Sequence, residues 1–286
     1  MPDSSNTIPG SVFEHWAGLN DDGLTREQLS HFAEHGWLVL EKVLSTTECT
    51  EYIDALEACF GLLDHSSEAL GYPGRQIQSP ACHSAFFLKW FKIPGLLAAH
   101  RQIIGMNEIR LGDQKAVTNV PHPGRRSDAE RLRDWTGWDW HRDFMPKWGL
   151  RRDDADTDLI NSLSVTSATF LTPASPEHGS TALLDASHLE DGTKPALGDG
   201  SRIVRITAAP GSIILFSECL WHATVPVFAE EPRYVLFSWM TAPWLALDPE
   251  MSMSPLPYAS RLADSEIRSL FSAPRPLDFG GLPKDG

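Results

Sequence analysis

Two short motifs far apart in the sequence constrain the fold of this chain more than any other feature. WHRDF places His141 and Asp143 two residues apart, and LFSECLWHAT brings in His222 much later. Side chains at positions i and i+2 leave a β-strand on the same side, so the first motif predicts a histidine and an aspartate on one strand face, with Arg142 pointing away. A histidine on an adjacent strand completes a set of three ligands only if the two motifs meet. We therefore predict one domain that contains both.

The three side chains have the chemistry of a 2-His-1-carboxylate iron centre. Such a set occupies one triangular face of an octahedron and leaves three positions open, as in non-haem Fe(II) oxygenases, where a cosubstrate and O2 must both reach the metal. An HxD triplet alone is weak evidence, because such triplets arise by chance. Support comes from Arg233, eleven positions after His222. A buried arginine near the metal is the expected partner for the distal carboxylate of 2-oxoglutarate, because its planar guanidinium pairs a carboxylate bidentately.

At this point the sequence resembles the phytanoyl-CoA dioxygenase family of Fe(II)/2-oxoglutarate-dependent oxygenases, which carry HxD, a distal histidine and an arginine at this spacing. The segment LSHFAEHGWLVLEKVLSTTECTEYIDAL resembles the family's opening helix, strand and helix. PEHGSTALLDASH resembles its NGxLxxxPGSH turn and strand, with Asp185 and Ala186 in place of the usual Pro-Gly. PGSIILFSECLWHAT matches GDxxxFxxxxxHxS, with Ser212 in place of the usual Asp. These blocks span most of the chain.

The resemblance implies an α+β fold with a double-stranded β-helix core, which is a jelly-roll, cupin-like arrangement of two packed antiparallel sheets with buttressing helices. The order of the elements supports the α+β class, because helices come first and a long series of strands follows. We predict an N-terminal arm over residues 1–24, a single catalytic domain over 25–250, and a tail over 251–286 with one short helix around Ala263 to Phe271. Residues 145–161 are predicted to form a lid over the site.

The resemblance also implies roles for individual residues and the cofactors Fe(II), 2-oxoglutarate and O2. The metal ligands, which are also the catalytic residues, are His141, Asp143 and His222. The residues expected to bind 2-oxoglutarate are Arg233, Thr224, Asn119 and Trp138. Related halogenases lack the carboxylate ligand so that chloride can bind in its place. Because Asp143 fills that position, we predict oxygen insertion, desaturation or ring closure on a small molecule.

Local signals predict several elements of the helical layer and the sheet. TREQLSHFAEHG carries a capping box formed by Thr25 and Gln28 and ends at Gly36, which predicts a helix. WLVLEKVL is strand-like, and Ser45 or Thr46 caps a second helix. A further helix is expected in IPGLLAAHRQIIG, and strands are expected in IRLGDQKAVTNV and NSLSVTSATFLTP.

Composition limits the partners and the location of the protein. The net charge of −14 over 286 residues argues against nucleic acid or an anionic membrane as partner, because phosphate binding needs a basic surface. It also favours a neutral or cationic small-molecule substrate over a CoA thioester. None of the four cysteines forms a CxxC pair, so no disulfide framework or zinc knuckle is expected. No apolar run approaches the roughly 20 residues needed to span a bilayer, and no signal peptide is evident at the N-terminus. We expect a cytoplasmic monomer or homodimer.

Two other classes of protein remain open from the sequence. The same three ligands suit Zn2+ in a hydrolase, with Glu218 as general base. That role is weakened if residues 218 and 222 lie on one strand two pleats apart, which is too far for a shared water. A non-catalytic protein that senses 2-oxoglutarate or another metabolite is the second alternative. The presence of all four key residues argues against it.

Overall fold

Two β-sheets form the core of the structure, a computed structural model that describes residues 16–62, 74–122, 128, 133–143, 150–151, 160–190, 197, 200–245 and 262–271. The larger sheet has seven strands, in the spatial order β1 (Trp16–Ala17), β2 (Trp37–Glu41), β10 (Ile213–Ser217), β7 (Ser164–Phe170), β12 (Arg233–Thr241), β4 (Arg110–Asn119) and β3 (Gly74–Gln78). The smaller sheet has the order β11 (His222–Thr224), β8 (Thr181–Leu184) and β9 (Ile203–Arg205). Neighbouring strands in both sheets are antiparallel, apart from the parallel pair of β1 and β2.

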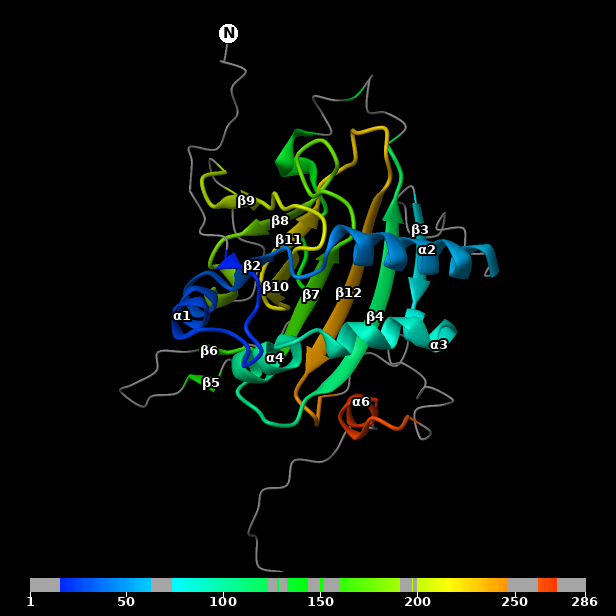
Figure 1. Ribbon diagram of the computed structural model, residues 1–286. Coiled ribbons are helices and arrows are strands. Elements are labelled where there is room, and N and C mark those ends of the chain that lie inside the picture. The colour runs from blue at the N-terminus through cyan, green and yellow to red at the C-terminus, as the bar shows by residue number, and fades with distance from the viewer. Residues whose placement is uncertain are drawn as a thin grey trace, which may run out of the picture.

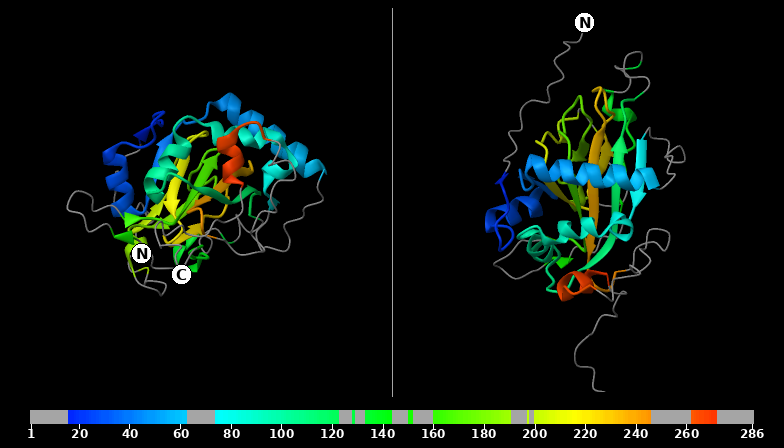
Figure 2. Two further views of the ribbon diagram at one scale, coloured as in Figure 1. Left: turned by 90° about the horizontal axis from the view of Figure 1, so that it is seen from below. Right: turned by 45° about the vertical axis from the view of Figure 1, so that its right-hand side comes forward.

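Helices cover one side of the larger sheet, as Figures 1 and 2 show for the three that lie across its strands. These are α2 (Thr46–Leu62), α3 (Pro80–His83) and α4 (Leu96–Ile104). The other helical segments are α1 (Arg26–His35), α6 (Ser265–Leu270) and the 3-10 helices η2 (Ala85–Lys92), η3 (Trp135–Gly137) and η4 (Ser187–Leu189). No helix among the described residues is both long and apolar enough to cross a bilayer.

The capping signals of the sequence are realised in α1. The Thr25 hydroxyl accepts from the Gln28 backbone N–H at 3.2 Å, and the Gln28 side chain accepts from the Thr25 N–H at 2.7 Å. Gly36 ends the helix with φ 82°, a left-handed conformation that glycine adopts without strain. A Cβ there would also lie 2.5 Å from the His188 ring. The predicted helix is therefore confirmed at both ends.

Alternation along the strands divides the buried side chains into distinct layers. On the helix-covered face, Leu38, Leu215 and Leu236 belong to the same apolar cluster as the helical residues Trp90 and Leu96. We call the opposite face of the larger sheet, together with the side chains that face it from the smaller sheet, the inner face.

The inner face forms the apolar layer between the two sheets. Phe170, Ile214 and Phe216 of the larger sheet cluster there with Leu183 and Val204 of the smaller one. A third cluster lies on the outer side of the smaller sheet. The predicted α+β jelly-roll with buttressing helices is confirmed.

Most elements expected from local signals are present. The predicted strands and helices correspond to β2, α2, α4, β4 and β7, and the short tail helix corresponds to α6. Within the predicted arm, Trp16 and Ala17 pair with β2, so this part joins the sheet edge. Leu150–Arg151 (β5) and Ile160–Asn161 (β6) form a small antiparallel pair. The rest of the proposed lid over 145–161 lies outside the described residues, so the lid stays a prediction.

Candidate metal centre

The structure brings His141, Asp143 and His222 together, as the sequence predicts. One ligand atom from each side chain lies within 4.8 Å of the others. The Nε2 atom of His141 is 3.6 Å from Oδ1 of Asp143, and that of His222 is 3.4 Å from Oδ2. Among the described residues, no other group of three or more His, Cys, Asp or Glu side chains brings its ligand atoms this close together.

Backbone pairing positions the two histidines. His141 and His222 form an isolated antiparallel bridge, in which each backbone N–H donates to the other residue's carbonyl at 2.9 Å. The first motif is therefore attached to the edge of β11 at one residue rather than forming the strand that was expected. Asp143 lies at the bend that follows. Arg142 points away, donating to the carbonyls of Ser187 and Glu190.

The protonation of both imidazoles suits metal binding through Nε2. His141 Nδ1 lies 2.8 Å from the Asp139 carbonyl, and His222 Nδ1 lies 3.0 Å from the Leu220 carbonyl. A carbonyl can only accept, so each Nδ1 carries the proton and each Nε2 presents a lone pair toward Asp143. Metal-binding histidines are oriented by the same kind of hydrogen bond. The residues present therefore fit a divalent metal ion.

Electrostatics favour an ionised carboxylate at the centre. Burial alone would raise the pKa of Asp143, but its hydrogen bond with His222 and the charges of His222 and His141 bring that pKa down to about 2. Burial would lower the pKa of His222, while its hydrogen bond to Asp143 raises that pKa above the ordinary value. When no metal is bound, the raised pKa of His222 means that a proton on its Nε2 is favoured at the position where a cation would bind. A metal ion can replace this proton.

Arg233 is a buried cation that forms no ion pair among the described residues. Its Nη1 donates to the Ser180 carbonyl at 2.8 Å and its Nη2 to Asn119 Oδ1 at 2.7 Å, while its buried Nε has no partner. Burial lowers the pKa of Arg233 to about 10. An uncompensated guanidinium in the interior is costly, and a carboxylate compensates it best. The site therefore fits the distal carboxylate of 2-oxoglutarate.

Two of the other three residues expected near the cosubstrate lie close to this arginine. Asn119 pairs with Arg233 both in strand register and through its side chain. Thr224 shares the strand face of His222 on β11. It precedes Val225, whose N–H donates to the same Ser180 carbonyl that Arg233 contacts. Arg233, Asn119 and Thr224 therefore mark one end of the inner face.

The structure places Trp138 elsewhere. It packs on the outer side of the smaller sheet, in a cluster with Ala182, Ala223 and Trp140. Ala223 is next to His222 in sequence, so the two side chains point to opposite faces of β11. The expectation that Trp138 contacts 2-oxoglutarate is therefore not supported. The loop before WHRDF carries Trp138 to the outside of the sheet, and periodicity within the motif gives no sign of this.

Glu218 also differs from its expected setting. It lies in the turn between β10 and β11 rather than on one strand with His222, so the pleat argument used for it was wrong. Glu218 is buried and accepts a hydrogen bond from the Thr166 hydroxyl. Burial and then the Asp143 charge raise its pKa well above the ordinary value. A fully buried carboxyl group with a raised pKa, which already accepts a hydrogen bond from Thr166, is poorly placed to act as the general base of a zinc hydrolase.

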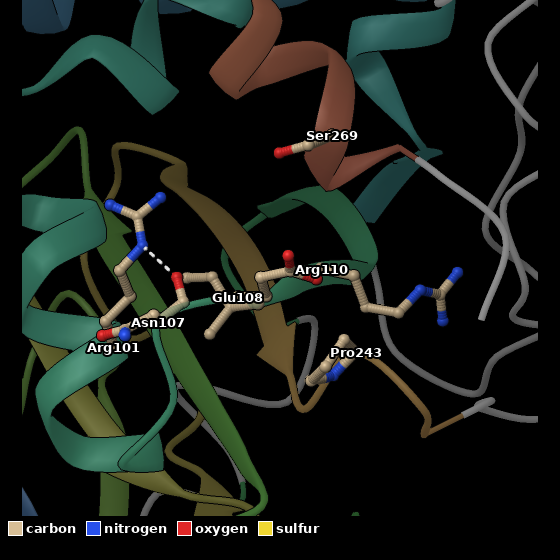
Figure 3. Close-up of a pocket in the computed structure, with 7 residues that line it drawn as sticks. Arg101, Asn107, Glu108, Arg110, Pro243 and Ser269 are labelled. Carbon is tan, nitrogen blue, oxygen red and sulfur yellow. Dashed lines mark hydrogen bonds between the residues drawn. The ribbon is translucent and has the colours of Figure 1, made fainter. Parts of the chain in front are cut away.

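Sequence reasoning missed Lys115, a cation on the inner face. Its Nζ lies 5.9 Å from the Phe237 ring centroid and 5.3 Å from that of Trp239. Alternation along β4 was the available signal, since Lys115 and Asn119 are four residues apart and share a face. A separate small pocket, drawn in Figure 3, includes Arg101 and Arg110 and lies at the other end of β4 from Asn119.

Comparisons with known proteins agree with this fold. The structure resembles crystal structures of HygX from Streptomyces hygroscopicus with nickel and 2-oxoglutarate bound, at a TM-score of 0.58 and 19% identity, covering 80% of this chain and 94% of that chain. It also resembles SnoK, an alpha-ketoglutarate-dependent carbocyclase from nogalamycin biosynthesis, at a TM-score of 0.60 and 14% identity, covering 86% of this chain and 94% of that chain. A third similar structure is the epimerase SnoN from nogalamycin biosynthesis, at a TM-score of 0.58 and 13% identity, covering 76% of this chain and 82% of that chain. At these identities the likeness shows the fold. No curated protein sequence matches significantly.

The jelly-roll core and the His-Asp-His group together define a cupin-like metal-dependent protein. Residues 32–235 match the family model described as phytanoyl-CoA dioxygenase (PhyH). The chain belongs to the phytanoyl-CoA dioxygenase family, which confirms the resemblance seen in the sequence. The predicted cofactors, Fe(II), 2-oxoglutarate and O2, are those of this family. The chain is thus an iron- and 2-oxoglutarate-dependent enzyme by family.

Proposed function

We propose that this protein is an Fe(II)/2-oxoglutarate-dependent oxygenase that oxidises an unactivated C–H bond of a small molecule and releases succinate and CO2. The observation that carries the proposal is the pairing of two sites on the inner face. One is the His141, Asp143 and His222 group with both Nε2 lone pairs directed inward. The other is Arg233, a buried cation without a described counter-ion. The first fits the metal and the second fits the cosubstrate.

Each residue has a defined task in this proposal. His141, Asp143 and His222 hold the iron, which when bound supplies the oxidative chemistry with O2 and 2-oxoglutarate. Arg233 neutralises the distal carboxylate of 2-oxoglutarate, and Asn119 fixes the guanidinium plane by accepting from Nη2. Thr224 is placed to donate its hydroxyl to the same carboxylate. Burial of Arg233 excludes water, which strengthens that ion pair.

The retained carboxylate of Asp143 favours oxygenation, desaturation or ring closure over halogenation. The substrate is proposed to be a specialised metabolite, an amino acid or an amino sugar. HygX has been crystallised with hygromycin B, and SnoK and SnoN belong to nogalamycin biosynthesis, so the fold accommodates small molecules in other proteins. The cytoplasmic location and the monomeric or homodimeric state stay predictions.

The experiment that tests this function measures succinate formed from 2-oxoglutarate by the Fe(II)-loaded protein in air. Arg233→Lys should raise the KM for 2-oxoglutarate by about 10-fold to 100-fold, because a lysine loses the bidentate contact, which is worth about 1.5–3 kcal/mol. Arg205→Lys is the control, since Arg205 is a half-buried arginine that lies over the Trp138 ring outside the smaller sheet. An unchanged KM in Arg233→Lys would assign Arg233 to structure. Hydrolysis by a zinc-loaded protein without succinate formation would replace the proposed function.

A further inference from the structure

The inner face of the larger sheet is only partly covered. Toward β2, β10 and β7 its side chains are buried against the smaller sheet, as with Ile214 and Phe170. Toward β12, β4 and β3 five side chains of this face are partly exposed, namely Phe237, Lys115, Val117, Gln76 and Gln78, while others such as Trp239 and Asp113 are buried. These five are neighbours in register, since Lys115 pairs with both Phe237 and Gln78, and Val117 pairs with Gln76. A continuous, accessible area thus adjoins the metal centre.

This area is next to the metal ligands rather than remote from them. The His222 ring lies 5.0 Å from that of Phe216, and Phe216 is in register with Thr166. Thr166 is in turn in register with Trp239, so one row of side chains leads from the centre to the rings beneath Lys115. The charge of Lys115 also acts on both Asp143 and His222.

Lys115 is positioned as a single positive charge above an aromatic platform. The rings of Phe237 and Trp239 are stacked with 5.8 Å between centroids and an interplanar angle of 26°. The Lys115 Nζ lies over both. None of the ion pairs formed by the described residues includes Lys115. A partly exposed ammonium that is held over rings and lacks a carboxylate partner can bind an anion.

The two buried carboxyl groups nearby are already satisfied by other donors. Asp113 accepts from the Gln114 N–H at 2.7 Å and from the Gln78 amide. Glu218 accepts from the Thr166 hydroxyl. Lys115 is therefore not their direct hydrogen-bond partner.

Lys115 is also too far from Arg233, the proposed partner of the distal carboxylate of 2-oxoglutarate, to share that role. Asn119, the register partner of Arg233, lies four residues from Lys115 on the same strand. This separation is about 13 Å at the rise of a β-strand, which is more than the carbon chain of 2-oxoglutarate spans. Lys115 is thus left for a different ligand.

We propose that Lys115 binds the carboxylate of the primary substrate, whose flat ring packs on the partly exposed Phe237. This inference rests on the proposed function, because the site is the substrate position of the same metal centre. A compact ammonium matches one negative charge, which favours a ring-bearing monocarboxylate. The local charge thus opposes the expectation from the net charge of the chain, which favoured a neutral or cationic substrate.

The test uses three matched probes with one carbon skeleton: 3-phenylpropanoate, 3-phenylpropanamide and 3-phenylpropylamine. Binding is measured by calorimetry on the full chain loaded with Ni(II) and 2-oxoglutarate, and the set is repeated with indole-3-propanoate and its amide. We expect the acids to bind at least about 10-fold more tightly than the amides, in line with about 1.5 kcal/mol for a charged hydrogen bond. Lys115→Gln should remove this preference, and Lys115→Glu should transfer it to the amine.

Controls separate this proposal from the function on which it rests. Lys89→Gln is the matched variant, because Lys89 Nζ lies 4.3 Å from the Phe86 ring centroid in the helical layer. It should leave the acid preference unchanged. A separate Ni(II) and 2-oxoglutarate titration reports on the metal centre itself. Where that titration succeeds, equal binding of acid and amide, no binding of any acid, or an unchanged preference in Lys115→Gln would each overturn the role of Lys115. Failure of the metal titration would instead count against the proposed function, and the probes would then be measured on the metal-free protein with the same criteria.

Discussion

The two sides of the larger sheet, one facing the helices and the other facing the smaller sheet, carry polar groups of very different status. On the helix-covered face several polar side chains are paired with one another. Gln114 donates to Ser238 at 3.2 Å, and the Trp90 indole N–H donates to Thr169 at 2.9 Å. On the inner face, the two histidines of the ligand group point their Nε2 atoms at the Asp143 carboxylate. The buried Nε of Arg233 has no hydrogen-bond partner among the described residues. The helix-covered face is thus organised for stability, and the inner face for binding.

Substitution of Asp143 is the strongest test of the claim that the inner face is organised for binding. Asp143→Gly removes one charge and one ligand, while His141 and His222 remain. We expect more than about 100-fold loss of succinate formation, because losing a ligand should exceed the 10-fold to 100-fold cost of losing its supporting groups. Product analysis in chloride should show at best traces of chlorinated product. Asp143→Glu should also be impaired, since one added methylene displaces the carboxylate by more than the roughly ±0.2 Å tolerated at a metal site. Parent rates in both variants would show that Asp143 is not a ligand.

Trp90 tests the opposite face. The side chain is fully buried, so Trp90→Ala should lower the free energy of unfolding by about 3–5 kcal/mol through cavity formation and loss of the Thr169 hydrogen bond. Activity per folded molecule should stay close to that of the parent. Chemical denaturation and kinetics at low temperature measure the two effects. Leu62→Ala is the control, because Leu62 is 85% exposed and its loss should change stability by less than about 0.5 kcal/mol. A Trp90→Ala protein of parent stability but lost activity would reverse the assignment of the faces.

Asp113 allows a measurement of how much stability the fold loses by burying a charged group on the inner face. Burial raises the pKa of this carboxyl group to about 6, from 3.8 in the unfolded chain. Between these values the folded state binds more protons than the unfolded state, so stability falls as pH rises from about 4 to about 6. Asp113→Asn should remove this loss and raise the free energy of unfolding at pH 7 by up to about 3 kcal/mol. The measurement is denaturant unfolding at a series of pH values. A difference between variant and parent that is the same at pH 4 and pH 7 would show that Asp113 does not titrate in this way.

The sequence predicted the parts of the molecule that local signals specify. The α1 cap at Thr25 and Gln28 follows from hydrogen-bonding residues, and the meeting of His141 with His222 follows from ligand spacing. The jelly-roll class was implied by the resemblance to the phytanoyl-CoA dioxygenase family. Lys115 and the partly exposed area of the inner face around it could not be predicted in this way. They depend on which strands the three-stranded sheet leaves uncovered, and this is set by pairing between distant segments. The face on which Trp138 packs could not be predicted for the same reason, since it is set by the loop before WHRDF.

The metal content of the protein tests the central claim most directly. Anaerobic titration of the metal-free chain with Fe(II) in the presence of 2-oxoglutarate should show one ion bound per chain, together with the weak visible charge-transfer band of a chelated keto acid. His222→Ala should lose the band and most of the iron, because it removes one of only three side-chain ligands in the group. Arg205→Lys should keep both. Tight zinc binding without that band, or unchanged iron binding by His222→Ala, would contradict the account.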